Sequence, residues 1–294
     1  MKLLLTGGSG FIGRNLKESF LSRKYDVVAP TRAQLDLMDE EAVREYVIRE
    51  QFDVIIHAAA KPGHRAVNDP TQILLTNTRI FFNLARNADY FGRLIITGSG
   101  AIYDTRNYTP KMQEDYFDTH VPVDEHGLSK YVIQKCIEGR PGKFVDLRIF
   151  GIYGKYEEYA IRFISNMICK ALFDLPLTIT RNRRFSYLYV DDLPTVMDFF
   201  ISHEPQHVAY NVTPDEVSEL YQIAEIVLAV SGKQLPIVVS QDGYGSDYTG
   251  NNSRLKREMG TLRFTPLKKG VAELYSWYRD NRHRIDTARL LVDR

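Results

Sequence analysis

The sequence predicts an α/β fold with a doubly wound parallel sheet and a smaller α/β lobe at the C-terminal end. As far as about residue 150, short aliphatic or β-branched runs alternate with longer amphipathic segments, which is typical of repeated βαβ units. A glycine-rich turn follows the first of these runs directly. Beyond residue 154 the alternation becomes irregular. We therefore expect a first domain at residues 1–154 and a smaller lobe at residues 155–294, some of whose elements return to the first domain.

The strands of the first domain are expected where apolar runs are short, because parallel strands are buried on both faces. These runs lie at residues 2–5, 26–29, 54–58, 94–97 and 144–149. Apolar residues at helical spacing predict the helices between them, at residues 10–22, 40–50, 72–87 and 126–138. Right-handed crossovers then place helices on both faces of the sheet. In the smaller lobe the pattern predicts helices at 160–172, 217–230 and 267–279, a strand at 177–180 and an aromatic run at 185–190.

Composition excludes several classes of partner and site. The chain has 294 residues, and its 38 Lys and Arg balance 37 Asp and Glu, so no strong overall field selects nucleic acid or an anionic membrane. No run approaches the ~20 apolar residues of a membrane helix, and the first apolar run is too short for a signal peptide. Cys136 and Cys169 have no metal-binding spacing, so no metal is expected. These features indicate a cytoplasmic protein.

The glycine-rich turn predicts a Rossmann-type dinucleotide-binding domain. Gly7, Gly10 and Gly13 lie between the first strand and the first helix. The first allows a tight turn, the second allows backbone N–H groups to approach a pyrophosphate, and the third allows close packing of helix and sheet. The N-terminal end of the helix then faces the anion. We therefore expect NAD or NADP as cofactor.

The residues after the second strand favour NADP over NAD. An acidic side chain at this place would bind the ribose 2′-hydroxyl of NAD, whereas an arginine accommodates a 2′-phosphate. The sequence here is Pro30, Thr31 and Arg32, and Asp26 lies too early in the strand for the acidic role. Arg32 therefore predicts NADP, with NAD as the alternative.

Several further segments extend this pattern along the chain. They are Leu35-Asp36-Leu37-Met38-Asp39, His57-Ala58-Ala59-Ala60, Asn77, the run from Thr97 to Tyr103, Gly127-Leu128-Ser129-Lys130, and Tyr189-Val190-Asp191-Asp192-Leu193. Together with the glycine turn they resemble the extended short-chain dehydrogenase/reductases, the NAD-dependent epimerase/dehydratase family, which act mostly on nucleotide sugars. Within that family the chain is most similar to the NADP-dependent 4-keto-sugar reductases, the group that contains GDP-fucose synthase and dTDP-4-dehydrorhamnose reductase.

The resemblance implies a role for individual residues. Ser99 would donate a hydrogen bond to the substrate oxygen, and Lys130 would hold the nicotinamide ribose and support the neighbouring acid. Besides the three glycines, Arg32 and Lys130, the implied cofactor contacts are Ser9, Phe11, Ile12, Asp36, Leu37, Ala58, Ala59, Ala60, Asn77 and Thr97. The implied substrate contacts are Ser99, Ala101, Tyr103 and Arg184.

One position departs from the family. The family has Tyr-x-x-x-Lys, in which the phenol transfers the proton, but the matching register here is His126 to Lys130. His126 is the general acid, a natural loss of that acid, or an introduced change. A second Tyr-x-x-x-Lys at Tyr131 to Lys135 would break the match of the Gly-Leu-Ser-Lys segment. The catalytic set predicted is therefore Ser99, His126 and Lys130.

The remaining residues favour ketone reduction over epimerisation. The positions that match the epimerising cysteine and histidine of GDP-fucose synthase are Ala101 and Arg162, and neither side chain shuttles a carbon-bound proton. The prediction is an NADP(H)-dependent reductase of a nucleotide-linked keto sugar. The alternatives are a nucleotide-sugar epimerase with retained NAD and a dinucleotide-binding protein impaired by His126. Arg181, Arg183 and Arg184 would bind the substrate diphosphate beside the aromatic run. A homodimer is expected from the resemblance.

Overall fold

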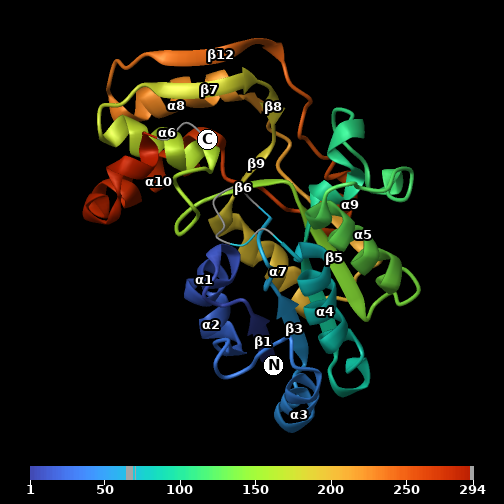
Figure 1. Cartoon of the computed structure of the whole chain (residues 1–294). Coiled ribbons are helices and arrows are strands. Elements are labelled where there is room, and N and C mark those ends of the chain that lie inside the picture. The colour runs from blue at the N-terminus through green and yellow to red at the C-terminus, as the bar shows by residue number, and fades with distance from the viewer. Residues whose placement is uncertain (64–68, 70, 292–294) are drawn as a thin grey trace.

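The first part of the fold is a six-stranded parallel sheet. It lies in the lower half of Figure 1. The computed structural model describes residues 1–63, 69 and 71–291. The strand order is β10-β5-β4-β3-β1-β2, and every neighbouring pair is parallel. The strands are β1 (Lys2–Thr6), β2 (Asp26–Val28), β3 (Val54–His57), β4 (Arg93–Ser99), β5 (Phe144–Ile149) and β10 (Ala209–Val212). The predicted doubly wound α/β class is confirmed.

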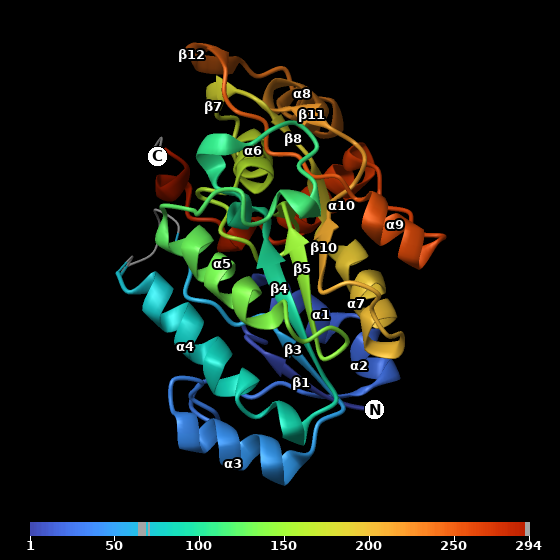
Figure 2. The same ribbon diagram turned by 90° about the vertical axis from the view of Figure 1, so that its right-hand side faces the viewer.

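Helices cover both faces of this sheet because successive side chains of each strand point to opposite sides. Leu3 and Leu5 pack toward α1 (Phe11–Glu18), α2 (Leu21–Lys24) and α7 (Leu193–Ser202). Leu4 packs in a separate core with the helices of the other face. These are α3 (Glu40–Glu50), α4 (Ile73–Ala85) and α5 (Glu125–Ile137). Figure 2 shows the two groups of helices on opposite sides of the strands.

Local capping explains where the helices begin and end. The carboxylate of Asp39 accepts a hydrogen bond from the Ala42 backbone at 3.1 Å, which fixes the start of α3. Asp124 caps α5 in the same way. The predicted helix at 10–22 is instead two helices, because Ser19 is extended. Its hydroxyl donates to the Leu16 carbonyl oxygen at 2.6 Å and accepts from the Leu21 backbone at 3.2 Å.

The prediction of five strands missed the sixth, β10. Its sequence, Ala-Tyr-Asn-Val, places the amide of Asn211 within a short apolar run, so it does not stand out as a strand. Asn211 is fully buried, and its side-chain nitrogen donates to the carbonyl oxygens of Met112 and Asn251. These partners allow a polar side chain in a buried strand. β10 and α7 return the chain from the lobe to the first domain.

The C-terminal lobe lies beyond the carboxyl ends of the strands (Figure 1). Its two-stranded pairs are β6 (Gly151–Tyr153) with β9 (Tyr187–Tyr189), β7 (Leu177–Asn182) with β12 (Ile237–Tyr244), and β8 (Arg184–Phe185) with β11 (Ser218–Glu219). Three helices, α6 (Phe163–Leu172), α8 (Leu220–Ser231) and α10 (Leu267–Asp280), share one apolar core with β7. A fourth helix, α9 (Ser253–Met259), places Leu255 in the core of the first domain. The predicted aromatic run is split between β8 and β9.

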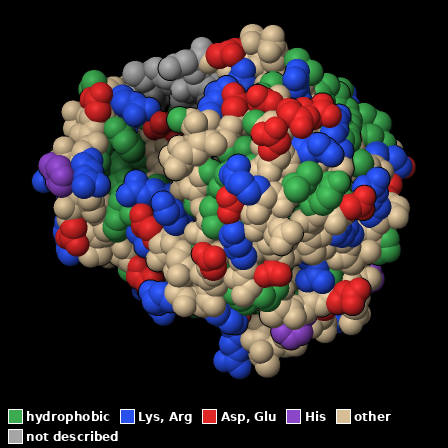
Figure 3. Space-filling model, turned by 90° about the horizontal axis from the view of Figure 1, so that it is seen from below, with side chains coloured by type: hydrophobic (Ala, Val, Ile, Leu, Met, Phe, Trp, Pro, Cys, Tyr) green, Lys and Arg blue, Asp and Glu red, His purple; other side chains and the backbone are tan. Residues whose placement is uncertain are grey.

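The face opposite the lobe carries no single dominant charge. Figure 3 shows basic and acidic side chains interspersed over the face opposite the lobe, in keeping with the formal net charge of +1. Within the described ranges, none of the helices combines the length and apolar character that crossing a membrane requires. The same residues contain no group of three or more His, Cys, Asp or Glu side chains arranged to hold a metal ion.

Candidate functional site

The glycine turn between β1 and α1 has the geometry of an anion-binding turn. Gly7 has a φ of +72°, and a Cβ atom there would lie 2.6 Å from the backbone nitrogen of Ala59. A Cβ atom on Gly13 would lie 2.1 Å from the Gly7 carbonyl oxygen, so α1 approaches the turn this closely only with glycine. Among the described residues no side chain caps α1, and its first turn, from Phe11, holds no acidic residue. The positive end of the helix is therefore open to a phosphate.

Small side chains at the ends of β3 and β4 line a cavity next to this turn. Gly10, Phe11 and Ile12 line it together with Ala58, Ala60 and Thr97. Ser9 is exposed at the tip of the turn. Asn77 lies behind this wall, where its side-chain oxygen accepts from the Lys61 backbone nitrogen at 2.7 Å and its nitrogen donates to the Lys61 carbonyl oxygen at 3.1 Å. Asn77 thus fixes the loop after β3 without lining the cavity.

The residues predicted to select the cofactor lie outside the cavity. A Cβ atom on Gly8 would lie 3.0 Å from the Ala29 side chain, so the end of β2 is next to the glycine turn. Three residues further on, Arg32 has an 84% exposed side chain, 3.6 Å from the Asp36 carboxylate. The carbonyl oxygen of Leu37 accepts from the Asn83 amide at 2.9 Å, which ties this loop to α4.

The cavity has a volume of about 1290 Å³ and is shared by the sheet edge and the lobe. It includes Ser99 at the end of β4, His126 and Lys130 on α5, and Ala101 in the turn between these elements. The sequence-predicted catalytic residues therefore meet at the carboxyl edge of the sheet, where ligands of open α/β sheets bind. Ser99 accepts a hydrogen bond from the Ala101 backbone nitrogen at 3.2 Å through its hydroxyl oxygen, which orients the side chain.

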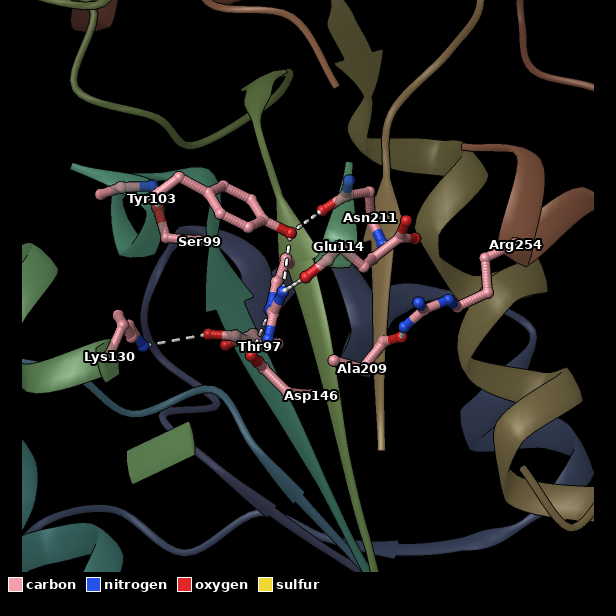
Figure 4. A network of polar contacts seen from close by, with 11 residues as sticks. Thr97, Ser99, Tyr103, Glu114, Lys130, Asp146, Ala209, Asn211 and Arg254 are labelled. Carbon is pink, nitrogen blue, oxygen red and sulfur yellow. Dashed lines mark hydrogen bonds and ion pairs between the residues drawn. The ribbon is translucent and has the colours of Figure 1, made fainter. Parts of the chain in front are cut away.

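Lys130 is part of a buried polar network (Figure 4). Its amino group donates to the Thr97 carbonyl oxygen at 3.1 Å, and only 9% of the residue is exposed. Burial lowers the pKa of Lys130, and the carboxylate of Asp146 opposes that effect. Asp146 also lies 3.3 Å from the Arg148 guanidinium, and both of these side chains are buried. A Cβ atom on Gly98 would lie 1.9 Å from Asp146 Oδ1, so the carboxylate occupies the space that a side chain on β4 would take.

Tyr103, predicted as a substrate contact, belongs to the far side of this network. Its hydroxyl donates to Asn211 Oδ1 at 2.7 Å and accepts from Arg148 at 2.7 Å, and the residue is 1% exposed. Figure 4 shows its ring directed toward Asn211 and away from Lys130. Tyr103 is not among the residues that line the cavity. Its described contacts are those of the buried network.

His126 lies one turn before Lys130 on α5 and faces the cavity. Burial lowers its pKa to about 4, and the positive charges of Lys130 and Arg162 act in the same direction while Asp124 opposes them. The Nδ1 atom is buried without a hydrogen-bond partner among the described residues. These effects favour the neutral imidazole in the ligand-free protein, and the general-acid role of His126 stays a prediction.

The second Tyr-x-x-x-Lys segment lies outside the cavity. The Tyr131 hydroxyl donates to the carboxylate of Asp118, and Lys135 forms an ion pair with the same carboxylate at 2.8 Å. Neither Tyr131 nor Lys135 lines the cavity.

The lobe contributes basic and aromatic side chains to the cavity. Arg162, Arg181 and Arg183 line it, whereas Arg184, a predicted substrate contact, lies in a separate hollow with Lys111 and is 3.9 Å from Glu219. The rings of Phe185 and Tyr187 stack at 5.0 Å with an angle of 16° between their planes, and both line the cavity. The lobe thus presents flat rings and guanidinium groups in one region.

Two residues of the cavity were missed by the sequence analysis. Glu157 is 6% exposed, and burial raises its pKa to about 7 although the Ser165 hydroxyl donates to its carboxylate. Tyr248 is half-buried and lines the cavity, and its ring centroid lies 5.1 Å from that of Phe150. Neither belongs to a local motif. The sequence signal available for Tyr248 was an aromatic residue in a polar, glycine-containing segment after β12.

Comparison with known proteins places the chain in a family. The sequence profile described as the NAD-dependent epimerase/dehydratase family matches residues 3–213, which is most of the chain. The chain belongs to this family. The resemblance read from the sequence motifs is thereby confirmed.

Individual members of the NAD-dependent epimerase/dehydratase family resemble the chain over most of its length. GDP-L-colitose synthase of Yersinia pseudotuberculosis is 23% identical over 79% of this chain and 83% of its own length. Among solved structures, the GDP-mannoheptose C4 reductase of Campylobacter jejuni with NADP bound has a TM-score of 0.80 at 20% identity, covering 95% of this chain and 98% of that one. UDP-glucose 4-epimerase of Thermotoga maritima with UDP-glucose has a TM-score of 0.83 at 18% identity, covering 96% and 100%.

Proposed function

We propose that this protein is an NADP(H)-dependent oxidoreductase that reduces a keto group of a nucleotide-linked sugar. The observation that carries the proposal is one shared cavity. It is lined by the glycine turn, by Ser99 and Lys130, and by arginine and aromatic side chains of the lobe. Membership of the family and the printed activities of GDP-L-colitose synthase and GDP-mannoheptose C4 reductase support it.

The residues around the glycine turn fit a dinucleotide. Backbone atoms occupy the space that Cβ atoms on Gly7 and Gly13 would need, so both positions require glycine. The N-terminal end of α1 carries no side-chain cap. When bound, NADPH supplies the hydride for the reduction. We assign its phosphates to the turn from Gly7 to Gly13 and its adenosine to the loop with Asp36 and Leu37. We assign the facing wall of the cofactor site to Ala58, Ala60 and Thr97, with Ala59 next to Gly7 and with Asn77 holding the loop after β3 from behind.

Arg32 is the residue that we propose to select NADP. Its side chain is exposed beyond β2 and forms a long ion pair with Asp36, so the guanidinium is available to a second anion. A hydrogen bond to a charged group is worth about 1.5–3 kcal/mol, which corresponds to roughly 10- to 100-fold in affinity.

The substrate would lie between the sheet edge and the lobe. Ser99 would donate a hydrogen bond to the keto oxygen, and Lys130 would hold the nicotinamide ribose with a positive charge nearby. Arg181 and Arg183 suit the diphosphate because guanidinium groups bind phosphate oxygens in pairs. The stacked rings of Phe185 and Tyr187 would receive the nucleotide base.

The test is NADPH consumption with a panel of 4-keto nucleotide sugars, followed by absorbance. We expect turnover with at least one member, and a Kd for NADPH that rises roughly 10- to 100-fold in Arg32→Ala with little change for NADH. Arg44→Ala, an exposed arginine on α3, is the matched control. NADPH binding without turnover across the panel would instead support a dinucleotide-binding protein impaired at His126. Tightly held NAD in the purified protein would support the retained-NAD epimerase.

The proposal also covers the roles of the two domains, the oligomeric state and the cellular location. We infer that residues 1–154 bind the cofactor and that residues 155–294 supply most substrate contacts. A homodimer through the helices that flank the sheet is proposed from membership of the family, and Leu75, which is 55% exposed on α4, is a residue at which it can be tested. Light scattering should then give twice the chain mass of 33.9 kDa, and Leu75→Glu should reduce that value. A cytoplasmic location suits the free thiols of Cys136 and Cys169.

A further inference from the structure

A short segment after β6, residues 154–156, joins the helix of the glycine turn to the lobe. That helix, α1, belongs to the first domain, and α10 belongs to the lobe (Figure 1). Directly after the segment the chain runs through residues that line the cavity, namely Glu157, Glu158, Ala160, Ile161 and Arg162. The contacts of the segment therefore decide where one wall of the proposed substrate site lies relative to the glycine turn.

The backbone of this segment is bonded to α1. The side-chain nitrogen of Asn15 donates to the Lys155 carbonyl oxygen at 2.8 Å and to the Phe11 carbonyl oxygen at 2.8 Å. Asn15 is 5% exposed, so water competes little for these two bonds. Phe11 is the first residue of α1 and lines the cavity. One buried amide thus joins the first turn of α1 to the segment.

Tyr156 makes a second contact with α1. Its hydroxyl donates to the Glu18 carboxylate at 2.8 Å, and the Arg14 guanidinium lies 3.6 Å from the centroid of its ring. Arg14 also donates to the Glu18 carboxylate at 2.9 Å, so each of these three side chains contacts the other two. Tyr156 itself lines the cavity. Its ring is therefore held against α1 at the border of the cavity.

Tyr156 also contacts α10 of the lobe. Its ring centroid lies 5.3 Å from that of Trp277 with an angle of 86° between the planes, which is an edge-to-face pair. The Trp277 ring lies 4.9 Å from that of Tyr278, which is 3% exposed and belongs to the apolar core of the lobe. One side chain thus touches a helix of each domain.

The backbone of Tyr156 adopts a conformation that needs support from its surroundings. Its φ is +73°, in the left-handed region that bulky side chains rarely adopt. Such residues persist where neighbouring contacts hold them, and they cluster at ligand sites and at segments that switch position. The contacts of Tyr156 with α1 and α10 are of this supporting kind.

We propose that Tyr156 is a positioning residue that links occupancy of the cofactor site to the shape of the substrate site. This inference rests on the proposed function. Through Arg14 and Glu18, Tyr156 follows α1, whose N-terminal end is assigned to the cofactor phosphates. Along the chain it sets the position of the loop that carries Arg162. Binding of NADP(H) at the glycine turn then favours the loop position that binds the nucleotide sugar.

The link is reciprocal, because both ligands act on the same positions of one loop. A nucleotide sugar should raise the affinity for the cofactor by the factor by which the cofactor raises the affinity for the sugar. A link made by a few hydrogen bonds and one ring contact lies at the lower end of the usual range of coupling, at about 5- to 10-fold in affinity.

Trp277 provides a first test that needs no turnover. It is the single tryptophan of the chain and is not among the residues that line the cavity. We expect NADP⁺, which does not absorb where tryptophan emits, to change the emission of Trp277 in the wild-type protein. Tyr156→Phe keeps a ring beside Trp277 but loses the bond to Glu18, so the emission change should become smaller. The Kd for NADP⁺ alone, measured by calorimetry, should stay within roughly 3-fold of wild type.

The second test uses a 4-keto nucleotide sugar that the enzyme reduces. In Tyr156→Phe we expect the KM for this sugar to rise about 5- to 10-fold with kcat nearly unchanged, because the loop moves and the reacting groups do not.

Tyr159→Phe is the matched control for both tests. Tyr159 lies in the same loop, but its hydroxyl accepts from the Asp286 backbone nitrogen at 2.9 Å, and the residue does not line the cavity. This variant should keep the wild-type emission change and the wild-type KM. Thermal unfolding checks that both variants are folded.

The proposal is overturned if NADP⁺ binds to the wild-type protein without changing the emission of Trp277. It is also overturned if Tyr156→Phe keeps either the wild-type emission change or the wild-type KM. A fall in kcat at unchanged KM would place Tyr156 in the chemical step instead. If the wild-type protein reduces no sugar of the panel, the reductase function fails, and the emission test alone then decides whether Tyr156 links α1 to the lobe.

Discussion

Glu157 gives a stability prediction whose size follows from its burial. Its pKa rises from the ordinary 4.5 to about 7, chiefly because burial disfavours the charged carboxylate. Below pH 4.5 the group is protonated in both the folded and the unfolded chain. As the pH rises toward 7, the unfolded chain releases this proton and the folded chain does not. Stability is therefore present at low pH and lost as the pH rises through the folded-state pKa.

The size of the loss can be worked out from these two values. Each pH unit between 4.5 and about 7 changes the free energy of unfolding by up to ~1.4 kcal/mol, which gives a total of about 3 kcal/mol. Glu157 is 6% exposed, so screening by solvent reduces this free-energy change only slightly. In Glu157→Gln the side chain cannot ionise, and this part of the pH dependence disappears.

The assay is urea unfolding of the ligand-free protein at a series of pH values. It is followed by the fluorescence of the single tryptophan, Trp277, whose ring lies 5.3 Å from that of Tyr156. We compare the free energy of unfolding of wild type with that of Glu157→Gln at each pH. The contributions of all other titrating groups cancel in this difference, which should fall by about 3 kcal/mol between pH 4.5 and pH 7. Ser165→Ala removes a hydrogen bond that favours the carboxylate and should extend the loss to higher pH. Parallel pH curves for wild type and Glu157→Gln would refute the reasoning.

Three further substitutions test the fold and the glycine turn. Asp146→Asn leaves the buried guanidinium of Arg148 without its counter-ion and should cost about 3–5 kcal/mol in urea unfolding; a cost under ~1 kcal/mol would show that the pair matters little. Gly13→Ala forces a Cβ atom to within 2.1 Å of the Gly7 carbonyl oxygen, so calorimetry should detect loss of NADPH binding, and wild-type affinity would contradict the proposed phosphate site. Asp39→Ala removes the cap of α3 and should lower stability by about 1 kcal/mol; an unchanged unfolding midpoint would argue against the cap.

The parts of the fold that sequence predicted are those that local chemistry specifies. The helix at residues 40–50 was predicted with its observed bounds, because Asp39 caps it and apolar residues recur along one side. The glycine turn was found because Gly7, Gly10 and Gly13 lie within one strand-turn-helix segment. The site residues Ser99 and Lys130 were predicted because their segments match motifs of the family in the same order and spacing. The structure brings both residues to one cavity.

The parts that sequence missed depend on contacts between distant segments. Asn211 can lie in a buried strand only because Met112 and Asn251 supply acceptors from elsewhere in the chain. Tyr248 lies in the cavity lining because its backbone pairs with that of Phe185 in β8. The low pKa of His126 arises from burial, and residue spacing carries no measure of burial.

The return of β10 to the sheet affects how the chain can fold during synthesis. β10 pairs with β5 from Ala209 opposite Asp146 to Val212 opposite Ile149, so β5 keeps one open edge until residue 212 has been made. An uncovered edge of a buried strand is a template for pairing with another chain. The first domain of the nascent chain therefore keeps this exposed edge, which favours aggregation, until residues 155–212, the first part of the lobe, have also been made.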